Sequence, residues 1–438
     1  MRFKEHHLPT TQTRSQQEET GGSTALPAAG TSRADGTRMD LTVLLLTRNE
    51  AENLRLLVPS LREVVASLRV QYEIVIVDDS DDATAQVARE LGCVVLAQEH
   101  VGYGAAFRQG LNAARGDFVL TIDADHSHPP QFLRQMWACR ERVDIVIAAR
   151  YVPGGRATMS LSRTILSRVL NWTFARVLTL SLSDLSSGYR LYRRAIIASL
   201  LPLRGKDFDV LEEILVKAWC AGYRIQEVAF EYRPRHAGRS NARALKFARS
   251  YLGTLGALWA LRNSAATCDY EARAFSSWIP MRRLRERRRF AIMSDVLHAA
   301  GRTLAIDCGS GIVVSSRPAT VVLDVNMAKL RLLKRTNPHL VCGAADALPF
   351  RDSAFSAVVC ATSPDPTAGL SALLTELRRV LAPRGTLLLD TRAETARAWD
   401  EPWRQAGFEL ETQQRVLGAE LIVCARAVAG APCNGEET

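Results

Sequence analysis

Runs of consecutive apolar residues alternate with helix-like segments from residue 41 onward, and this alternation constrains the fold more than any other feature of the chain. The runs LTVLLLT, YEIVIVDDS and CVVLAQE are separated by the segments EAENLRLLVPSLREVVASL and DATAQVARELG. Strands that are apolar throughout are buried on both faces, as in parallel sheets that are covered by helices. The sequence therefore predicts an α/β fold with a largely parallel sheet.

A second series of such segments begins near residue 269. Its predicted strands are RTLAIDCGS, ATVVLDV, FSAVVCA and GTLLLDT, and the segment GLSALLTELRRVL has apolar residues at helical spacing. The two series show no clear repeat of each other, and 438 residues is long for a single core. We therefore expect two different α/β domains, over residues 40–265 and 266–428, with residues 1–39 and 429–438 as disordered ends.

No segment of the sequence is apolar for long enough to cross a bilayer, which takes about 20 residues. The longest apolar run, SYLGTLGALWAL, lies between Arg249 and Arg262, and the opening MRFKEHH lacks the apolar stretch of a secretory signal. The nine cysteines are scattered without a C-x-x-C pair, which favours reduced thiols in an intracellular protein. We therefore expect a cytoplasmic protein that can touch the cytoplasmic face of a membrane.

Half of the net charge of +10 comes from one segment, MRRLRERRRF, which has six Arg and one Glu. A basic run is usually a solvated helix face, and here neither aromatic residues nor a nucleic-acid motif accompany it. Anionic lipid headgroups would be an equally good partner. We expect no nucleic-acid partner, and no pattern in the sequence predicts the oligomeric state.

Polar residues directly follow the predicted strands of the first series, with TRNE at 47–50, DDSDD at 78–82 and DADHS at 123–127. In parallel sheets, ligands bind at the carboxyl ends of the strands. An Asp-x-Asp pair supplies hard oxygen ligands for Mg²⁺ or Mn²⁺, which can neutralise the diphosphate of a nucleotide sugar before it leaves. The alternative is that Asp123 and Asp125 only cap a turn.

Six sequence blocks stand in order between residues 41 and 262: LTRNEAENL, IVIVDDSDDAT, VGYGAAFRQGLNAARGDFVLTIDADHSHPP, AARYVPGG, SDLSSGYRLYRR and FDVLEEILVKAWCAGYRIQEV. Together they resemble the family-2 inverting glycosyltransferases of the GT-A fold, and among these the polyprenyl-phosphate (dolichyl-phosphate) mannosyltransferases. The resemblance implies that Asp123 and Asp125 bind the metal and the donor diphosphate, with Asp125 as a catalytic residue. It assigns the base and ribose of the donor to five residues at the first two strand ends: Thr47, Asn49, Glu50, Asp78 and Asp79.

Later blocks match positions that serve the acceptor. The resemblance implies that Arg150 and Arg163 meet the acceptor phosphate as catalytic residues. Ser187 and Arg190 would line the same cleft, and Glu213 would face the reaction centre. The alternatives are that Arg190 is a surface charge and that Glu213 is a solvated helix residue.

The segment RHAGRSN is similar to the Arg-x-x-Gly-x-Ser-Lys pattern of the family, but Asn241 stands in place of the Lys. The matching Arg235 and Ser240 are expected at the phosphate site. One cation is missing there, and Arg235, Arg239 or Arg243 would have to replace it.

The acceptor decides whether a general base is needed. A polyprenyl phosphate is a monoester with a second pKa of about 6, so at neutral pH it is largely a nucleophilic dianion. A hydroxyl acceptor would instead need a carboxylate base, for which Glu213 and Asp184 are the candidates. The apolar tail of a lipid would find a surface in ILSRVLNWTFARVLTLSL, unless this segment is a buried helix.

The second series resembles the class I S-adenosylmethionine-dependent methyltransferases, through AIDCGSG, VVLDV, GAADALPF and LRRVLAPRGTLLLD. The resemblance assigns five residues to S-adenosylmethionine: Asp307, Gly309, Gly311, Asp324 and Asp346. Val313 at the third glycine position and Pro318 in the first helix depart from the family pattern, and the usual Glu-His pair is absent from VVCATSPDPTAGL. We expect a methyltransferase-like, Rossmann-like fold that binds S-adenosylmethionine weakly or not at all.

The favoured function is transfer of a hexose, of the mannose or glucose type, from a nucleotide-diphosphate sugar to polyprenyl phosphate with the help of Mg²⁺ or Mn²⁺. One alternative is a bifunctional enzyme that also methylates a small natural-product or glycan acceptor. The other is an inactive nucleotide-binding scaffold, against which the intact carboxylates at 78, 79, 123 and 125 argue.

Overall fold

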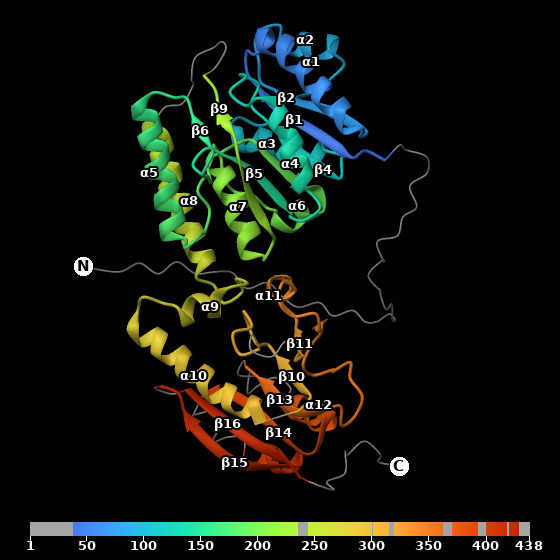
Figure 1. Cartoon of the computed structure of the whole chain (residues 1–438), viewed down its shortest axis with the longest axis vertical. Helices are drawn as coiled ribbons and strands as arrows, with labels where there is room; N and C mark the ends of the chain where they lie inside the picture. Colours follow the sequence, from blue (N-terminus) through green and yellow to red (C-terminus); the bar gives the residue numbers. More distant parts are fainter. Residues whose placement is uncertain are drawn as a thin grey trace, which may run out of the picture. The chain divides into compact units, whose positions relative to one another are not determined.

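A computed structural model describes residues 38–234, 244–299, 301–314, 319–361, 370–392, 400–417 and 420–428. These residues form two seven-stranded sheets with helices packed against them and one two-stranded sheet (Figure 1). The expected α/β class is therefore confirmed. Nearly all of the predicted disordered ends, 1–39 and 429–438, lies outside the described residues, and the domain boundary near residue 265 stays a prediction.

The first sheet has the strand order β3-β2-β1-β4-β7-β5-β8, in which β7 runs antiparallel to both of its neighbours and the other pairs are parallel. Its strands are β1 (Leu41–Thr47), β2 (Tyr72–Asp78), β3 (Val94–Ala97), β4 (Phe118–Thr121), β5 (Ile145–Ala149), β7 (Arg190–Arg193) and β8 (Ile225–Ala229). The separate two-stranded sheet pairs β6 (Arg156–Ala157) with β9 (Glu231–Tyr232).

Helices pack on both faces of the first sheet because alternate side chains of a strand point to opposite faces. Leu44 belongs to the core under α3, α6 and α7, whereas Val43 and Leu45 belong to the core under α1, α2 and α4. The helices of this half are α1 (Ala51–Leu68), α2 (Thr84–Glu90), α3 (Tyr103–Ala113), η1 (Pro130–Phe132), α4 (Leu133–Cys139), α5 (Leu161–Val177), α6 (Arg194–Leu200), α7 (Asp209–Cys220) and α8 (Ala244–Arg262).

The register of the first sheet ends β1 and β2 at the same level. Thr47 pairs with Asp78, the last residues of the two strands, and Leu44 pairs with Thr121 at the end of β4. Parallel strands in this register present their carboxyl ends along one edge. The polar residues that follow β1, β2 and β4 therefore lie on the same edge of the sheet.

The second sheet has the order β12-β11-β10-β13-β14-β16-β15, with β16 antiparallel to β14 and β15. Its strands are β10 (Thr303–Ile306), β11 (Val321–Asp324), β12 (Leu340–Cys342), β13 (Phe355–Cys360), β14 (Leu381–Arg392), β15 (Phe408–Arg415) and β16 (Glu420–Ala427). The helices are α9 (Tyr270–Phe275), α10 (Pro280–Ala299), α11 (Met327–Leu333), α12 (Leu370–Val380) and α14 (Asp400–Gln405). α12 and α14 pack in the core on one face, and α10 and α11 in the core on the other.

The start of α3 packs unusually close to the loop that precedes α7. The Gly104 N–H donates to the Lys206 carbonyl at 2.9 Å, and Arg108 donates to the Gly205 carbonyl at 2.7 Å. A Cβ placed on Gly104 would lie 2.1 Å from the Gly205 carbonyl oxygen. Only glycine permits this approach of two backbones.

Gly104→Ala should lower the free energy of unfolding by about 1–3 kcal/mol, because the added methyl group pushes the two backbones apart. Gly253→Ala in α8 is the matched control, since nothing lies within 4 Å of its added Cβ. The control should be neutral or stabilising by up to about 1 kcal/mol. Urea unfolding followed by tryptophan fluorescence measures both, and equal effects would contradict the close packing.

Candidate active site

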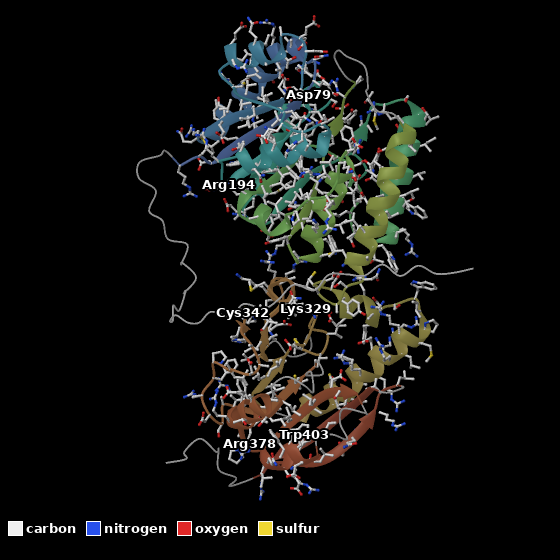
Figure 2. All side chains as sticks on the ribbon, turned by 180° about the vertical axis from the view of Figure 1, so that it is seen from behind. Asp79, Arg194, Lys329, Cys342, Arg378 and Trp403 are labelled. Atoms are coloured by element: carbon white, nitrogen blue, oxygen red, sulfur yellow. The ribbon has the colours of Figure 1, made fainter. Side chains whose placement is uncertain are left out.

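The residues expected to hold the nucleotide base and ribose lie together at the ends of β1 and β2. Thr47 Oγ1 donates to Asp78 Oδ1 at 2.6 Å, and Ser80 Oγ donates to the same oxygen at 2.6 Å. Asp78 and Thr47 are buried, whereas the neighbouring Asp79 is half exposed. Asp79 is labelled in Figure 2. Asp78 therefore fixes the two strand ends, and Asp79 presents its carboxylate to solvent.

Asn49 and Glu50 complete this part of the site. Asn49 has a left-handed backbone, with φ of 59°, which a short polar residue tolerates. Its side-chain oxygen accepts from the Asp81 N–H at 3.1 Å, and Glu50 Oε2 accepts from the Asn53 amide at 2.5 Å. The turn after β1 is thus tied to the turn after β2.

Asp123 and Asp125 follow β4 on the same edge. Asp125 is 4% exposed, and its Oδ1 accepts from the Ser127 N–H at 3.0 Å. The Ser127 hydroxyl is buried and has no hydrogen-bond partner. Two carboxylates and a hydroxyl are all oxygen donors, so the residues present fit a Mg²⁺ or Mn²⁺ ion. The described residues contain no metal-binding cluster of three or more His, Cys, Asp or Glu side chains, so this site offers a pair of carboxylates rather than a complete ligand cage.

His128 is a residue of this loop that the motif analysis missed. It is 2% exposed and stacks on Tyr189, with ring centroids 5.2 Å apart. Burial lowers its pKa, although the negative charge of Asp123 opposes the shift, so the ring is neutral at neutral pH. The neutral Nδ1 accepts from the Asp123 N–H at 3.2 Å and orients the backbone of the carboxylate pair. The motif DADHSHPP contains this histidine but does not reveal its burial.

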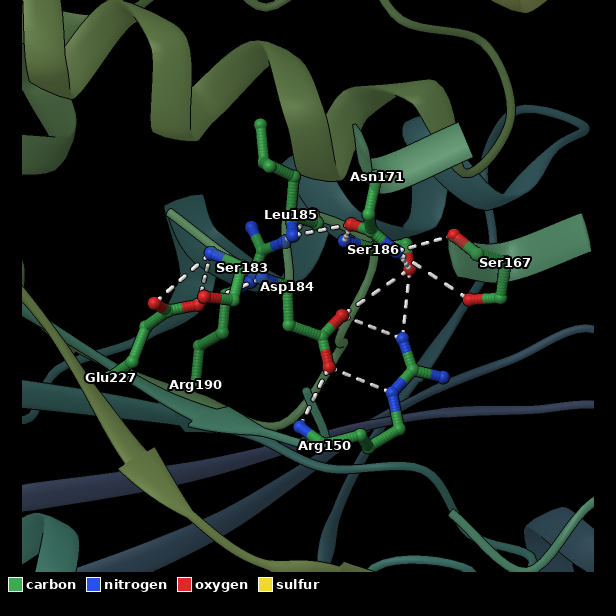
Figure 3. Close-up of polar contacts among 9 residues, drawn as sticks. All are labelled: Arg150, Ser167, Asn171, Ser183, Asp184, Leu185, Ser186, Arg190 and Glu227. Atoms are coloured by element: carbon green, nitrogen blue, oxygen red, sulfur yellow. Dashed lines mark hydrogen bonds and ion pairs between the residues drawn. The ribbon is translucent and has the colours of Figure 1, made fainter. Parts of the chain in front are cut away.

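Arg150 and Asp184 form a buried bidentate ion pair (Figure 3). The Arg150 Nε and Nη2 atoms donate to the two carboxylate oxygens at 2.8 and 2.6 Å, and the Arg150 backbone N–H donates to Oδ2 at 2.9 Å. Burial lowers the pKa of Arg150, but the hydrogen bonds and charge of Asp184 more than offset this, and the net shift is upward. Arg150 therefore stays charged with part of its guanidinium committed to Asp184.

Ser187 and Arg190 lie on the same loop and on β7. The Ser187 hydroxyl is buried without a hydrogen-bond partner. Arg190 is fully buried and donates to the carbonyl oxygens of Leu211, at 2.7 Å, and Leu185. This placement excludes a surface charge for Arg190 and favours a role in positioning the loop rather than contact with an acceptor.

The two adjacent glutamates of α7 differ in their surroundings. Glu213 Oε2 accepts from the N–H groups of Arg204 and Gly205, both at 2.7 Å, and its Oε1 pairs with Lys217 at 2.7 Å. Glu213 therefore holds the loop before α7 and is not a solvated helix residue. Glu212 is 1% exposed, and neither of its carboxylate oxygens has a hydrogen-bond partner. Burial raises the pKa of Glu212 to about 8, although the positive charge of Arg190 opposes the shift.

The remaining acceptor residues are divided between α5 and the undescribed segment. Arg163 lies on the exposed face of α5. Arg235 and Ser240, with Arg239, Asn241 and Arg243, lie outside the described residues. α5 buries only Asn171 and Phe174, so it is not a buried core helix.

The second predicted site lies at the ends of β10 and β11. Gly309 and Gly311 have φ angles of 63° and 76°, which the turn after β10 requires. Burial, with the nearby charge of Asp324, raises the pKa of Asp307 to about 6. Asp324 is buried and its Oδ2 has no hydrogen-bond partner, whereas Asp346 is exposed in the turn after β12. Pro318 lies outside the described residues.

Comparison with known proteins finds one family match in each half of the chain. Residues 42–201 match the model of glycosyl transferase family 2, and residues 304–389 match the model of a methyltransferase domain. The dolichyl-phosphate hexose transferase of Haloferax volcanii is 28% identical over 201 residues, which are 45% of this chain and 84% of that protein. The polyprenol monophosphomannose synthase of Mycolicibacterium smegmatis is 33% identical over 216 residues, 45% of this chain and 79% of that protein.

Among solved structures, glucosyl-3-phosphoglycerate synthase from Mycobacterium tuberculosis aligns with a TM-score of 0.42 and 19% identity, over 51% of this chain and 80% of that chain. The sequence relatives establish the class of protein, a glycosyltransferase with an α/β methyltransferase-type domain after it. The chain belongs to glycosyl transferase family 2. The expected fold class and the resemblance to polyprenyl-phosphate mannosyltransferases are therefore confirmed.

Glu212→Gln should remove a pH-dependent loss of stability. The folded-state pKa of about 8 lies above the ordinary carboxyl value of 4.5. Neutral Glu212 therefore contributes stability that is fully present below pH 4.5 and is lost as the pH rises toward 8. Each unit of pKa shift is worth about 1.4 kcal/mol. The stability advantage of the variant over the unsubstituted protein should therefore grow by roughly 3 kcal/mol between pH 5 and pH 8. Urea unfolding at both pH values, with Glu63→Gln on the exposed face of α1 as control, measures this, and parallel pH profiles would contradict it.

Proposed function

We propose that the first half of the chain transfers a hexose, of the mannose or glucose type, from a nucleotide-diphosphate sugar to polyprenyl phosphate, with inversion and with Mg²⁺ or Mn²⁺. The names of the two relatives, a dolichyl-phosphate hexose transferase and a polyprenol monophosphomannose synthase, support this acceptor class. The geometry adds one independent observation, which concerns the two candidate general bases.

The two carboxylates that the sequence suggests as general bases, Asp184 and Glu213, are both occupied. Asp184 is fully buried and bonded to Arg150 through both oxygens. Glu213 accepts two backbone N–H groups and pairs with Lys217. A base must reach the proton that it removes. A phosphate dianion needs no such group, so the occupied carboxylates favour a phosphate acceptor.

The donor would bind along the edge formed by β1, β2 and β4. The turns after β1 and β2, which carry Asn49 and Asp79, would take the base and ribose. Asp123 and Asp125 would hold the metal, which when bound neutralises charge on the leaving diphosphate. The two carboxylates would supply part of the ligand set, which would leave coordination positions for the diphosphate and water.

Exposed apolar side chains on α5 and α8 offer a surface for the lipid tail. Those on α5 include Leu161, Leu166 and Trp172, of which Trp172 is 68% exposed. α8 adds the exposed Leu252 and Trp259. α5 also carries the exposed Arg163, Arg168 and Arg176. A helix with exposed apolar and basic residues suits an anionic membrane surface.

None of the described helices has the length and apolarity that crossing a membrane requires. We propose a peripheral enzyme on the cytoplasmic face of the membrane.

An acceptor panel tests the function. A labelled set of nucleotide-hexose donors is offered with polyprenyl phosphate, with neutral polyprenol and with water-soluble hydroxyl acceptors. Label should enter polyprenyl phosphate only, because only that acceptor arrives as a nucleophile, and excess chelator should abolish the transfer. Asp125→Asn should lower the rate by at least about 100-fold, whereas Glu63→Gln should not change it. Transfer to a neutral hydroxyl, or full activity in chelator, would refute the proposal.

The lipid surface has its own test. Trp172→Glu should weaken transfer to long-chain polyprenyl phosphate in anionic vesicles by about tenfold, because it places a charge on the proposed membrane face. Transfer to a short, water-soluble prenyl phosphate should be unchanged. Leu56→Glu is the control, since Leu56 is similarly exposed, at 52%, but lies on α1. Equal losses in the two variants would reject α5 as the lipid surface.

A further inference from the structure

A cavity of about 260 Å³ lies at the carboxyl ends of strands in the second sheet, outside the glycosyltransferase site. It is lined by the glycine turn after β10, by residues at the ends of β13 and β14, and by side chains of α9 and α10. Three residues of this lining carry the inference: Glu271, Gly309 and Arg289. The charged side chains of Glu271 and Arg289 lie where a cofactor of this fold would bind.

Glu271 of α9 directs its carboxylate into the glycine turn. Its Oε2 accepts from the Ser310 N–H at 2.9 Å, and its Oε1 accepts from Lys329 Nζ at 2.9 Å. In return, the Ala272 N–H donates to the Ser310 hydroxyl at 2.7 Å. Three hydrogen bonds therefore fasten α9 to the turn and to α11.

The glycine turn is shaped to admit this carboxylate. A Cβ placed on Gly309 would lie 2.3 Å from Glu271 Cδ, so any other residue would displace the glutamate. Backbone N–H groups in such turns form cradles for anions. In this protein the anion bound by the turn is the Glu271 carboxylate of the chain itself.

S-adenosylmethionine does not fit the turn in this state. The tail of the cofactor carries a carboxylate beside an ammonium group, and the Ser310 N–H that could receive the carboxylate is already bonded to Glu271. Asp307 and Asp324 add further acidic groups close by. A second carboxylate would meet an occupied donor and like charges.

We propose that Glu271 is a built-in substitute for a ligand carboxylate and keeps the glycine turn of the second half closed to S-adenosylmethionine. This closure does not depend on the proposed glycosyl transfer. Arg289 of α10 strengthens it, since it pairs with Asp390 and donates to the Ala361 carbonyl at the ends of β14 and β13. Both α9 and α10 are thus bonded to residues at the strand ends where the cofactor would enter.

Removal of the Glu271 carboxylate should convert the glycine turn from one that repels a ligand carboxylate into one that binds it. Glu271→Ala leaves the Ser310 N–H without its carboxylate acceptor and Lys329 without its carboxylate partner. Both groups attract an incoming carboxylate, because one is a hydrogen-bond donor and the other a cation. Glu271→Ala therefore vacates the space in the turn and leaves the positive charge of Lys329 to attract the carboxylate of the cofactor.

Calorimetric titration of the full chain with S-adenosylmethionine tests the proposal. Glu271→Ala should bind at least tenfold more tightly than the unsubstituted protein. The control Glu409→Ala removes an exposed carboxylate from the edge strand β15 and should leave binding unchanged. Glu271→Gln should give a smaller gain, because its amide oxygen can still accept from Ser310 while the charge is gone. Micromolar binding by the unsubstituted protein, or no gain in Glu271→Ala, would overturn the proposal.

A measurement without substitution guards against a variant that fails to fold. Decarboxylated S-adenosylmethionine shares the nucleoside, the sulfonium and the ammonium of S-adenosylmethionine but lacks the carboxylate. If Glu271 holds the place of that carboxylate, the unsubstituted protein should bind S-adenosylmethionine no more tightly than the decarboxylated compound. A tenfold preference for S-adenosylmethionine would show that the tail reaches the turn despite Glu271 and would equally overturn the proposal.

Discussion

The acceptor side of the candidate active site depends on one buried ion pair, between Arg150 and Asp184. The carboxylate binds both the guanidinium and the backbone N–H of Arg150, so the loop before β7 is fixed to the end of β5. Removing one partner of such a pair costs about 3–5 kcal/mol, because the other charge is left buried and alone. Asn171 and Glu227 accept the N–H groups of the flanking loop residues, as Figure 3 shows.

The same loop connects this ion pair to the metal carboxylates. Beyond Ser187 it reaches Gly188, whose carbonyl accepts from Thr121 Oγ1 at 2.6 Å, at the end of β4. A Cβ on Gly188 would lie 3.4 Å from Asp123 Oδ1, so the loop passes beside the carboxylate pair. Fixing the loop through Arg150 and Asp184 therefore also fixes one wall of the donor site.

Sequence patterns predicted which residues lie at the strand ends. They did not predict which way side chains point, and this determines whether a residue faces the site or the interior. Asp78 and Asp123 lie on one edge because β1 pairs in parallel with β2 and β4, and strand pattern alone indicates that. The spacing of Arg190 and Glu213 in their motifs does not reveal that both bond to backbone in the interior. Glu271 and Ser310 are 39 residues apart, so no local pattern could join them.

Both halves of the chain have a mixed seven-stranded sheet with helices packed on it, but the hydrogen bonding at the carboxyl ends of the strands differs. Buried polar atoms normally have hydrogen-bond partners, so exceptions mark places where a ligand or ion is expected. In the first half, the hydroxyls of Ser127 and Ser187 are such exceptions, and both lie on the loops that flank Asp123. In the second half, Glu271 satisfies the Ser310 N–H, and one oxygen of Asp324 remains without a partner. The unpartnered hydroxyls at the first edge therefore favour an external ligand, whereas the glycine turn at the second edge is already bonded to an anion of the chain itself.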